Sequence, residues 1–308
     1  MSAVALCICT CRRPKGLRRL LEAVAELDYE GNLGVIVVDN DAVAREGEAV
    51  CREMAPEYRW PLRHAIEEQR GISYARNRSV AMALEDEPDF IAMLDDDEWP
   101  TRGWLKELLR VQAETDADVV GGPMFAEFAV PPPDWMRRGG FFDRDLRRPD
   151  GAVARIECTA NFLARADCFR ILMPHPFALQ FALSGGSDTV FFRSLAWRGF
   201  AMRWAANATV YETVPPSRMT LAWLRQRQFR TGNVLLAIHQ IFTPGAVHEA
   251  VRALKTVAFI MAGALLFCIA WPSPIWRTRS ILMVCKGLGI LSRYGGRTVL
   301  EYTVIHGS

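Results

Sequence analysis

The stretch FIAMLDDDE, residues 90–98, decides the fold of this chain. The apolar run Phe90–Leu94 is followed at once by four acidic residues, Asp95–Glu98. A short continuous apolar run is typical of a strand buried on both faces of a parallel sheet. Such sheets bind their ligands beyond the carboxyl ends of the strands. The acids therefore lie where a binding site is expected.

Two earlier apolar runs end in the same way. Ala3–Cys9 leads into the polar segment Thr10–Lys15, and Val35–Val38 leads into Asp39–Asp41. Segments with helical spacing separate the runs: Gly16–Leu27 and Ile72–Leu84. This β-α-β-α order predicts an α/β fold with a mostly parallel central sheet and helices on both faces. The three polar clusters are expected at one edge of that sheet.

The regular alternation stops after Pro123. Residues Val130–Gly151 contain three consecutive prolines, five arginines and the aromatic residues Trp135, Phe141 and Phe142. Long irregular loops inside compact domains are usually functional or mobile. We expect this loop to close over a substrate or to touch lipid through its aromatic side chains. Four further elements are predicted: a strand at 155–163, a helix at 188–198, a strand at 208–211 and a helix at 221–241.

Composition excludes several classes of protein. The chain has 308 residues, is 50% hydrophobic and carries a net charge of +2, which argues against a disordered chain and against a nucleic-acid partner. Cys7, Cys9 and Cys11 alternate within an apolar run, so they share one face of a strand. We interpret the eight cysteines as unpaired residues in a reducing compartment rather than zinc ligands. The N-terminus lacks a basic region, which predicts no signal peptide.

The C-terminal region, residues 246–308, differs from the rest because it is apolar and basic, with seven basic and two acidic side chains. Its uncharged run Val257–Trp271 extends about 22 Å as a helix, whereas a bilayer core is about 30 Å thick. Pro272 and Pro274 end the run. We therefore expect amphipathic helices that lie on a membrane surface, with basic groups reaching lipid phosphates, rather than a span. The alternative is a buried core helix followed by a solvated one.

Asp95 and Asp97 point to the same side if the strand continues through them, because side chains alternate. Clustered carboxylates suit a hard cation such as Mg²⁺ or Mn²⁺ that bridges to a substrate phosphate. An acidic surface turn is the alternative. Asp39 could accept a hydrogen bond from a ribose or base, or cap a helix. Arg76 could hold a nucleotide or lie on a helix surface.

Two later segments also carry candidate chemistry. Asp188 follows the flexible segment Ser184–Ser187 and could act as a general base or cap the next helix. Arg227 and Arg230 form an i,i+3 pair that could grip a diphosphate or form a solvated face. The sequence contains neither G-x-x-x-x-G-K nor G-x-G-x-x-G, so P-loop and Rossmann nucleotide sites are not supported.

In order and spacing, these motifs over residues 3–240 resemble family-2 glycosyltransferases with the GT-A fold. They are most similar to the succinoglycan-type exopolysaccharide glucosyltransferases. The matching segments are Cys9–Pro14, Val37–Asn40, Gly71–Asn77, Leu94–Glu98, Gly185–Asp188 and Phe229–Gly232.

The resemblance implies a nucleoside-diphosphate-sugar donor, with a UDP-sugar favoured, and Mg²⁺ or Mn²⁺ as the cofactor. It implies roles for particular residues. Those expected to bind the donor are Thr10, Arg13, Asp39, Arg76, Asp95, Arg227 and Arg230. Asp97, with Asp95, would hold the metal, and Asp188 would be the base. Those expected to bind the acceptor are Gly186, Ser187 and Asn161.

The resemblance also implies what the enzyme makes. One base on the face opposite the leaving group predicts direct displacement, which inverts the anomeric carbon. Processive synthases of the family carry Q-x-x-R-W, whereas this chain has Arg227–Thr231, RQFRT. This departure favours addition of a single sugar in surface polysaccharide or glycolipid synthesis. We expect the acceptor to be a saccharide, linked to a lipid diphosphate.

The expected organisation is a catalytic domain at 1–245, with a nucleotide-binding half at 1–124 and an acceptor half at 125–245. A membrane-associating region at 246–308 would hold the enzyme at the cytoplasmic face of the inner membrane. Two other functions stay open at this point. One is a nucleotidyltransferase, which would also use paired acids and a metal. The other is a non-catalytic nucleotide-binding membrane scaffold, for which Asp188 would be dispensable.

Overall fold

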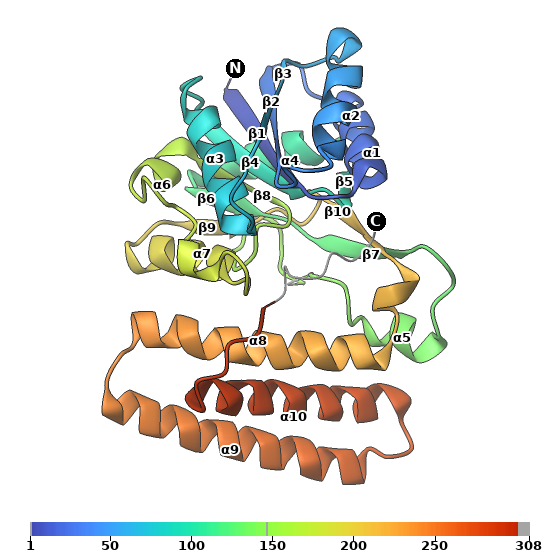
Figure 1. Cartoon of the computed structure of the whole chain (residues 1–308), viewed down its shortest axis with the longest axis vertical. Coiled ribbons are helices and arrows are strands. Elements are labelled where there is room, and N and C mark those ends of the chain that lie inside the picture. The colour runs from blue at the N-terminus through green and yellow to red at the C-terminus, as the bar shows by residue number, and fades with distance from the viewer. Residues whose placement is uncertain (1, 146, 301–308) are drawn as a thin grey trace.

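The computed structural model describes residues 2–145 and 147–300, and its centre is a seven-stranded sheet (Figure 1). The strand order is β3-β2-β1-β4-β8-β6-β9. The first four strands are parallel, whereas β8 is antiparallel to both of its neighbours. The strands are β1 (Ala3–Thr10), β2 (Asn32–Asp39), β3 (Leu62–Ile66), β4 (Phe90–Asp95), β6 (Val119–Gly121), β8 (Phe162–Arg165) and β9 (Met202–Trp204). The predicted mostly parallel α/β sheet is confirmed.

Helices cover both faces of this sheet, as its near-continuous apolar strands require. One buried cluster joins the sheet to α1 (Pro14–Ala25), α2 (Glu46–Met54) and α4 (Trp104–Thr115). A second cluster on the other face joins it to α3 (Ile72–Leu84), α6 (Ala166–Arg170) and α7 (Ser187–Trp197). Short 3-10 turns lie at η1 (Ala55–Glu57), η2 (Leu179–Phe181) and η3 (Pro216–Arg218).

The register of the parallel strands brings the polar clusters together. Cys9 on β1 pairs with both Val38 on β2 and Asp95 on β4. Thr10 pairs with Asp39. The polar residues after each strand therefore meet at one edge of the sheet, as the sequence predicts.

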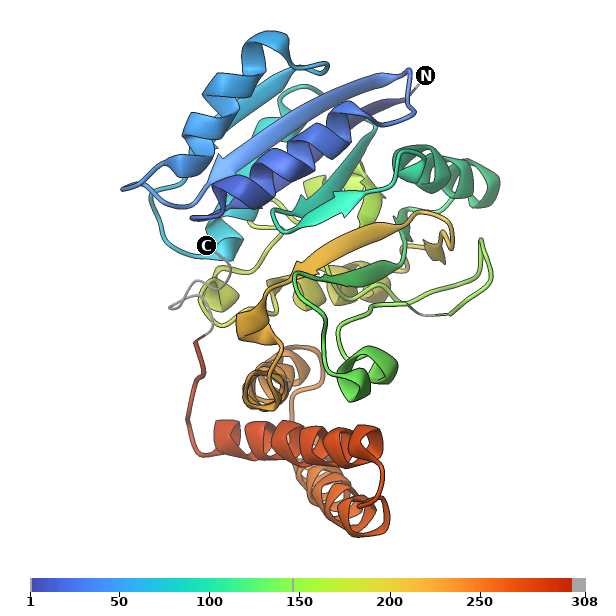
Figure 2. The same cartoon turned by 90° about the vertical axis from the view of Figure 1, so that its right-hand side faces the viewer.

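A second, three-stranded sheet lies between the central sheet and the C-terminal helices (Figure 2). Its order is β5-β10-β7, where β5 is Glu98–Pro100, β7 is Met124–Phe128 and β10 is Val210–Val214. Glu98 of β5 and Glu212 of β10 are directly paired. This small sheet therefore carries residues from distant parts of the chain to the acidic turn at Asp95–Asp97.

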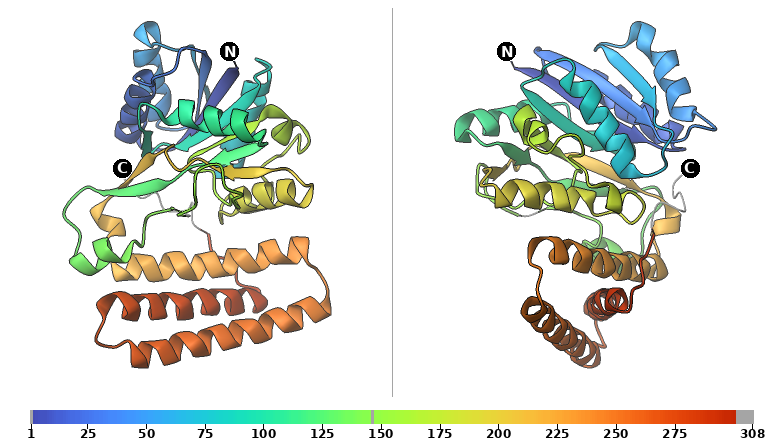
Figure 3. Two further views of the ribbon diagram at one scale, coloured as in Figure 1. Left: turned by 180° about the vertical axis from the view of Figure 1, so that it is seen from behind. Right: turned by 60° about the vertical axis from the view of Figure 1, so that its left-hand side comes forward.

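Three long helices form a separate layer below the sheets: α8 (Leu221–Phe242), α9 (Ala246–Ile269) and α10 (Pro274–Tyr294). All three run across the long axis of the molecule, and α9 is the outermost (Figures 1 and 3). Gly232 of α8 and Gly289 of α10 allow a very close approach of their helices. The buried Asn233 donates from Nδ2 to Ser292 Oγ at 3.0 Å and to the carbonyl of Arg297 at 2.7 Å.

Two local predictions were wrong. The strand expected at 155–163 begins only at Phe162, because Asn161 adopts a left-handed conformation (φ 61°) that interrupts extended backbone. The segment expected to be an irregular loop contains the short helix α5 (Asp134–Gly139). Phe142 is buried and stacks on Trp223 with ring centroids 5.6 Å apart, so it does not touch lipid. Trp135 and Phe141 pack edge to face with each other.

Replacing Gly289 by alanine is expected to destabilise the helical layer. A Cβ atom at this position would lie 1.9 Å from the carbonyl oxygen of Phe229, so α8 and α10 must separate. Overpacking of this kind costs about 1–3 kcal/mol, which thermal unfolding would register as a lower Tm. Gly34→Ala is the matched control, since a Cβ atom added there would meet nothing within 4 Å. Equal melting temperatures for Gly289→Ala and wild type would contradict the close packing.

Candidate active site

A cleft of about 220 Å³ opens at the carboxyl edge of the parallel strands. Its lining includes seven arginines and four acids, so its walls carry more positive than negative charge. The acids are Asp95, Asp96, Asp97 and Glu212, and the arginines are Arg13, Arg70, Arg76, Arg144, Arg218, Arg227 and Arg230. A mainly cationic cleft that also contains clustered carboxylates suits an anionic ligand together with a cation.

Asp96 organises the floor of the cleft. Thr10 donates from Oγ1 to Asp96 at 2.9 Å, and Arg13 donates from Nη1 to Asp96 at 2.8 Å. Burial raises the pKa of Asp96 to about 6, although Arg13 opposes this shift. Sequence analysis did not select Asp96, because a continuing strand would point it away from Asp95 and Asp97. The chain turns after Asp95, and Asp96 instead anchors the segment that follows β1.

Arg76 and Asp95 form an ion pair at the end of β4, with 3.2 Å between Nη2 and Oδ1. Arg76 is buried on α3, which begins after Gly71. The backbone N–H of Gly71 donates to the side chain of Asn40 at 2.7 Å. The residues following β2 and β4 and the start of α3 are therefore fixed to one another around the cleft.

Asp97 lies between two guanidinium groups. Arg13 is 3.0 Å and Arg218 is 3.2 Å from its Oδ2 atom. Arg218 also donates to Glu212 on β10 at 2.9 Å. The carboxylate selected as a metal ligand thus belongs to a continuous chain of charges, from Asp96 through Arg13, Asp97 and Arg218 to Glu212.

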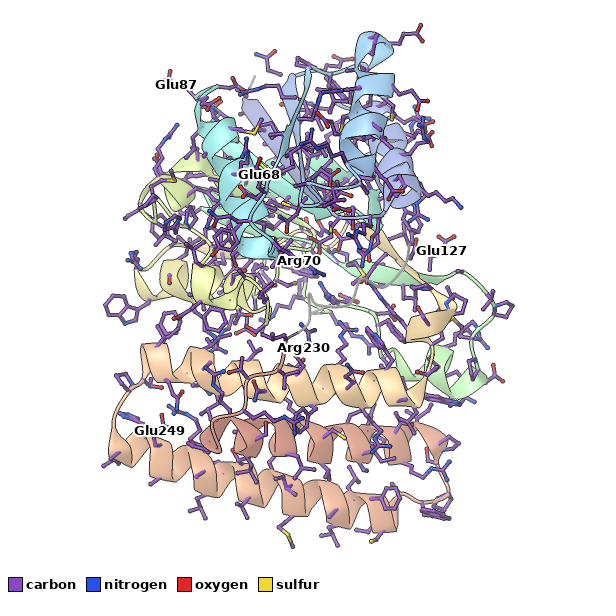
Figure 4. All side chains as sticks on the ribbon, viewed as in Figure 1. Glu68, Arg70, Glu87, Glu127, Arg230 and Glu249 are labelled. Carbon is purple, nitrogen blue, oxygen red and sulfur yellow. The ribbon has the colours of Figure 1, made fainter. Side chains whose placement is uncertain are left out.

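Arginines from the helical layer close the other side of the cleft. Arg227 and Arg230 of α8 both line it, and their binding of a diphosphate stays a prediction. Figure 4 shows Arg230 directed from α8 toward the sheets, with Arg70 on the facing wall. The cleft is therefore bounded by the central sheet above and by α8 below.

Asp39 does not line the cleft. It is buried, and its carboxylate accepts hydrogen bonds from the backbone N–H groups of Asp41, Gly47 and Glu48 at 2.8–3.2 Å. Gly47 and Glu48 lie in the first turn of α2, so these contacts match the second role considered from the sequence, in which Asp39 caps a helix. Its neighbours Thr10 and Asn40 do line the cleft.

Asp188, Gly186 and Ser187 also lie outside the cleft lining. They start α7, where Gly186 (φ 100°) packs closely against Val234 of α8. Ser187 is fully buried, whereas Asp188 is partly exposed and accepts from the N–H of Thr189 at 2.7 Å. Burial raises the pKa of the Cys158 thiol, Arg144 opposes this shift, and the negative charge of Asp188 adds to it. Asp188 thus lies near a thiol that also neighbours a cleft arginine.

Asn161 is not placed to bind an acceptor directly, which corrects our expectation. It is buried, its Oδ1 accepts from Trp104 Nε1 at 2.7 Å, and its Nδ2 donates to the carbonyls of Pro123 and Ala208 at 2.7 and 2.6 Å. These bonds use most of the hydrogen-bonding capacity of the amide. Asn161 instead ties α4 to the segments just before β7 and β10.

Besides Asp96, several charged or aromatic cleft residues were not selected by the sequence analysis: Arg70, Arg144, Glu212, Arg218 and Trp223. The available signals were the arginine-rich loop at 130–151 and the position of Glu212 directly after the strand expected at 208–211. Neither signal shows which other residues lie nearby in the fold. Apart from Arg70, these residues reach the cleft through the second sheet and through α8. Their position depends on pairing between segments far apart in the chain.

The acidic turn fits a divalent cation by its chemistry. Asp95 and Asp97 supply the hard oxygen atoms that Mg²⁺ and Mn²⁺ prefer, and both line the cleft. Among residues 2–145 and 147–300, no three His, Cys, Asp or Glu side chains converge as a metal site. Mg²⁺ is commonly held by one or two carboxylates with substrate phosphates. Asp95 and Asp97 suit that mode of binding.

Comparison with known proteins identifies relatives of the whole chain. The glycosyl transferase family 2 model matches residues 5–172. The chain is 33% identical over 299 residues to the succinoglycan biosynthesis protein ExoM of Rhizobium meliloti (strain 1021), covering 96% of this chain and 93% of that protein.

Solved structures share the fold at lower identity. Residues 1–349 of S. aureus TarS, in complex with UDP-GlcNAc, superpose with a TM-score of 0.55 at 15% identity, covering 96% of this chain and 92% of that one. The mannosyltransferase PcManGT from Pyrobaculum calidifontis, in complex with GDP-Man and Mn²⁺, gives 0.57 at 17% identity, covering 98% and 77%. The family match and the full-length relative, on a GT-A-like fold, establish that this chain belongs to glycosyltransferase family 2.

Proposed function

We propose that this glycosyltransferase moves one sugar from a nucleoside-diphosphate sugar to a saccharide acceptor in exopolysaccharide synthesis, with inversion at the anomeric carbon. The observation that carries this proposal is the cleft in which Asp95 and Asp97 face arginines from the loop at 130–151 and from α8. ExoM is named for succinoglycan biosynthesis, and TarS and PcManGT were solved with nucleotide sugars. These relatives support the donor class and the pathway type.

Thr10, Arg13 and Arg76 would hold the nucleoside end of the donor, with Asp39 supporting the loop after β2. Asp95 and Asp97 would hold Mg²⁺ or Mn²⁺, which when bound neutralises charge on the leaving diphosphate. Arg227 and Arg230 would contact the diphosphate. Guanidinium forks match phosphate oxygens and stay charged, so these groups would stabilise the negative charge that develops as the sugar leaves.

Asp188 would act as the general base. Its carboxylate would take the proton of an acceptor hydroxyl as that oxygen attacks the anomeric carbon and the bond to the diphosphate breaks. Gly186 and Ser187 would shape the acceptor side next to it. Attack from the face opposite the leaving group inverts the configuration of the sugar.

Thermal-shift measurements against a set of nucleotide sugars with Mn²⁺ would identify the donor, because a ligand that binds only the folded state raises Tm. Transfer to an acceptor extract, with NMR of the product, would then test the reaction. We expect an inverted anomer. A product with the configuration of the donor would refute direct displacement, and the absence of any transfer would refute the function.

The outermost helix supports attachment to a membrane. α9 is 24 residues long with a mean hydropathy of 1.8 over its most apolar window, and only 11% of that window is buried. The helix begins at Ala246, before the uncharged run at Val257, and its first turns contain charged residues. The sequence-based argument that the helix is too short to cross a bilayer therefore does not hold. Exposed apolar side chains are Val247, Val251, Leu254, Val257, Met261, Leu265 and Ile269. Length and composition alone do not distinguish a span from a surface helix.

We propose that α9 lies in the plane of the membrane. It runs across the long axis of the molecule, side by side with α10 (Figures 1 and 2). Trp271 and Trp276 are exposed just after α9 and carry Arg277 and Arg279 over their rings at 5.2 and 5.0 Å. Aromatic and basic side chains together favour the headgroup region of a bilayer. This supports a monotopic enzyme at the cytoplasmic face of the inner membrane that acts on a lipid-linked acceptor. Residues 301–308 of the predicted membrane region lie outside the described residues.

Exchanging both Leu254 and Leu265 for glutamine is expected to weaken binding to vesicles that contain phosphatidylglycerol by at least about tenfold. Burying one leucine contributes about 1.5–3 kcal/mol, and about 1.4 kcal/mol corresponds to a tenfold change. Flotation of the full chain with vesicles measures the effect. Val43→Gln is the control, because Val43 is also highly exposed but lies beside α2. Unchanged flotation of the double variant would argue against this face as the attachment surface.

A further inference from the structure

Glu212 interacts with three arginines, of which the sequence analysis selected only Arg227. This nearly buried carboxylate on β10 pairs with Arg218 at 2.9 Å. Burial raises the pKa of Glu212 and the charge of Asp97 adds to this shift, whereas Arg144, Arg218 and Arg227 oppose it. Arg144, Arg218 and Arg227 come from three segments of the chain and line the same cleft as Glu212, and Arg218 pairs with it directly. We refer to Arg144, Arg218 and Arg227 as the arginine triad.

The charges of the triad are balanced unequally. Burial disfavours the charge of Arg144 but its acidic neighbours raise its pKa overall, and Arg218 pairs with Asp97 and Glu212, whereas Arg227 is surrounded mainly by like charge. Burial, together with the charges of Arg144, Arg230 and Arg218, lowers the pKa of Arg227 to about 10, and Glu212 opposes this shift. Such crowding of like charges is costly in a buried place and is relieved by an anion. The Nε atom of Arg218 is also buried without a hydrogen-bond partner among the described residues. A buried N–H of this kind is a donor available to a ligand.

The triad has a common aromatic support. Trp223 lines the cleft and stacks on Phe142. The guanidinium carbons of Arg218 and Arg227 lie 5.8 and 5.2 Å from the centre of the Trp223 ring. Phe142 is two residues before Arg144. The stacked Phe142–Trp223 pair therefore holds the backbone near Arg144 next to the side chains of Arg218 and Arg227. The arginines are thus preorganised rather than left to sample solvent.

We propose that the arginine triad, positioned by Glu212, is a diphosphate-binding subsite that works without a divalent cation. Each guanidinium presents a fork of N–H groups that matches phosphate oxygens. The triad adjoins Asp97 through Arg218, so a diphosphate there also reaches the acidic turn. This inference rests on the proposed function for the source of the ligand, since both a nucleotide sugar and a lipid-linked acceptor carry a diphosphate.

Calorimetric titration of the full chain with inorganic pyrophosphate in EDTA tests the subsite. We expect binding to wild type, and at least tenfold weaker binding to Arg144→Lys, Arg218→Lys and Glu212→Gln. Lysine keeps the charge but not the fork, so its effect reports on geometry. Arg225→Lys is the matched control, because Arg225 is an exposed arginine on the same helix as Arg227. Glu212→Asp should recover part of the affinity, as expected for a positioning residue. Arg218 lies on the short turn η3, so its variant stays informative if Arg144→Lys fails to fold.

Two further titrations identify the source of the diphosphate. Weaker binding of UDP to the variants, with prenyl diphosphate unaffected, assigns the triad to the donor; the reverse result assigns it to the acceptor. Either result supports the subsite. No binding of pyrophosphate to wild type in EDTA, or equal binding to wild type and the three variants, overturns it. Sugar transfer by wild type is measured separately. If the enzyme transfers sugar but does not bind pyrophosphate in EDTA, only the subsite is refuted. If it binds pyrophosphate but does not transfer sugar, only the proposed function is refuted.

Discussion

Asp188→Asn is expected to reduce kcat for sugar transfer by about 10²–10⁴-fold while leaving donor affinity unchanged. This is the usual contribution of a positioned general base. Asparagine keeps an oxygen that can accept from the N–H of Thr189, so the start of α7 should stay intact. Because Asp188 lies outside the lining of the cleft, its loss should not disturb the donor contacts. Single-turnover kinetics and titration with the donor nucleotide measure the two quantities separately.

Asp167→Asn is the matched control for this experiment. Asp167 lies in the first turn of α6, as Asp188 does in α7, and its ion pair with Arg170 is exposed. The control should transfer sugar at the wild-type rate. Wild-type turnover by Asp188→Asn would remove the base from the mechanism. A non-catalytic scaffold would likewise tolerate the change. Because the chain belongs to glycosyltransferase family 2, we expect an enzyme rather than a scaffold.

Asp97→Asn is expected to abolish binding of Mn²⁺ in the presence of UDP and to lower kcat by at least about 10²-fold. A metal contributes several kcal/mol of charge stabilisation, and about 1.36 kcal/mol corresponds to a tenfold change in rate. The substitution also removes the charge that holds Arg13 and Arg218. Electron paramagnetic resonance of Mn²⁺ gives the binding readout independently of activity.

Asp116→Asn is the control for Asp97, because Asp116 is an exposed acid that contacts only Arg165 among the ion pairs of the described residues. Its variant should bind Mn²⁺ and turn over like wild type. Full activity of the wild-type enzyme after exhaustive chelation would show that the acidic turn serves another purpose. The arginine triad would then be the principal means of neutralising the leaving group.

The central part of the site was accessible from the sequence because it depends on local pattern. Apolar runs locate the strands, and parallel strands end at one edge, so Thr10, Arg13, Arg76 and the acids after β4 had to be neighbours. The bend after Asp95 was not predictable from alternation. It directs Asp96 to Thr10 and Arg13 instead of away from them.

The other wall of the site depends on long-range pairing that a single sequence does not encode in any local pattern. Glu212 reaches the cleft because β10 pairs with β5 and β7, which are about a hundred residues away in the chain. α5 has only six residues, too few to show a helical period. The start of α9 was hidden because its first turns are charged: Glu249 there bonds to Arg252 and to Tyr294 of α10.

The close contact between α8 and α10 has a consequence for anyone who wishes to crystallise a water-soluble version. α8 supplies Arg227 and Arg230 on one side and Gly232 packed against α10 on the other. Cutting the chain after residue 245 would leave that glycine-lined side bare and let the helix that carries two cleft arginines shift or unravel. Recoating the outer surface of α9 with polar side chains, while keeping all three helices, is the safer route to a soluble enzyme that still holds its substrate.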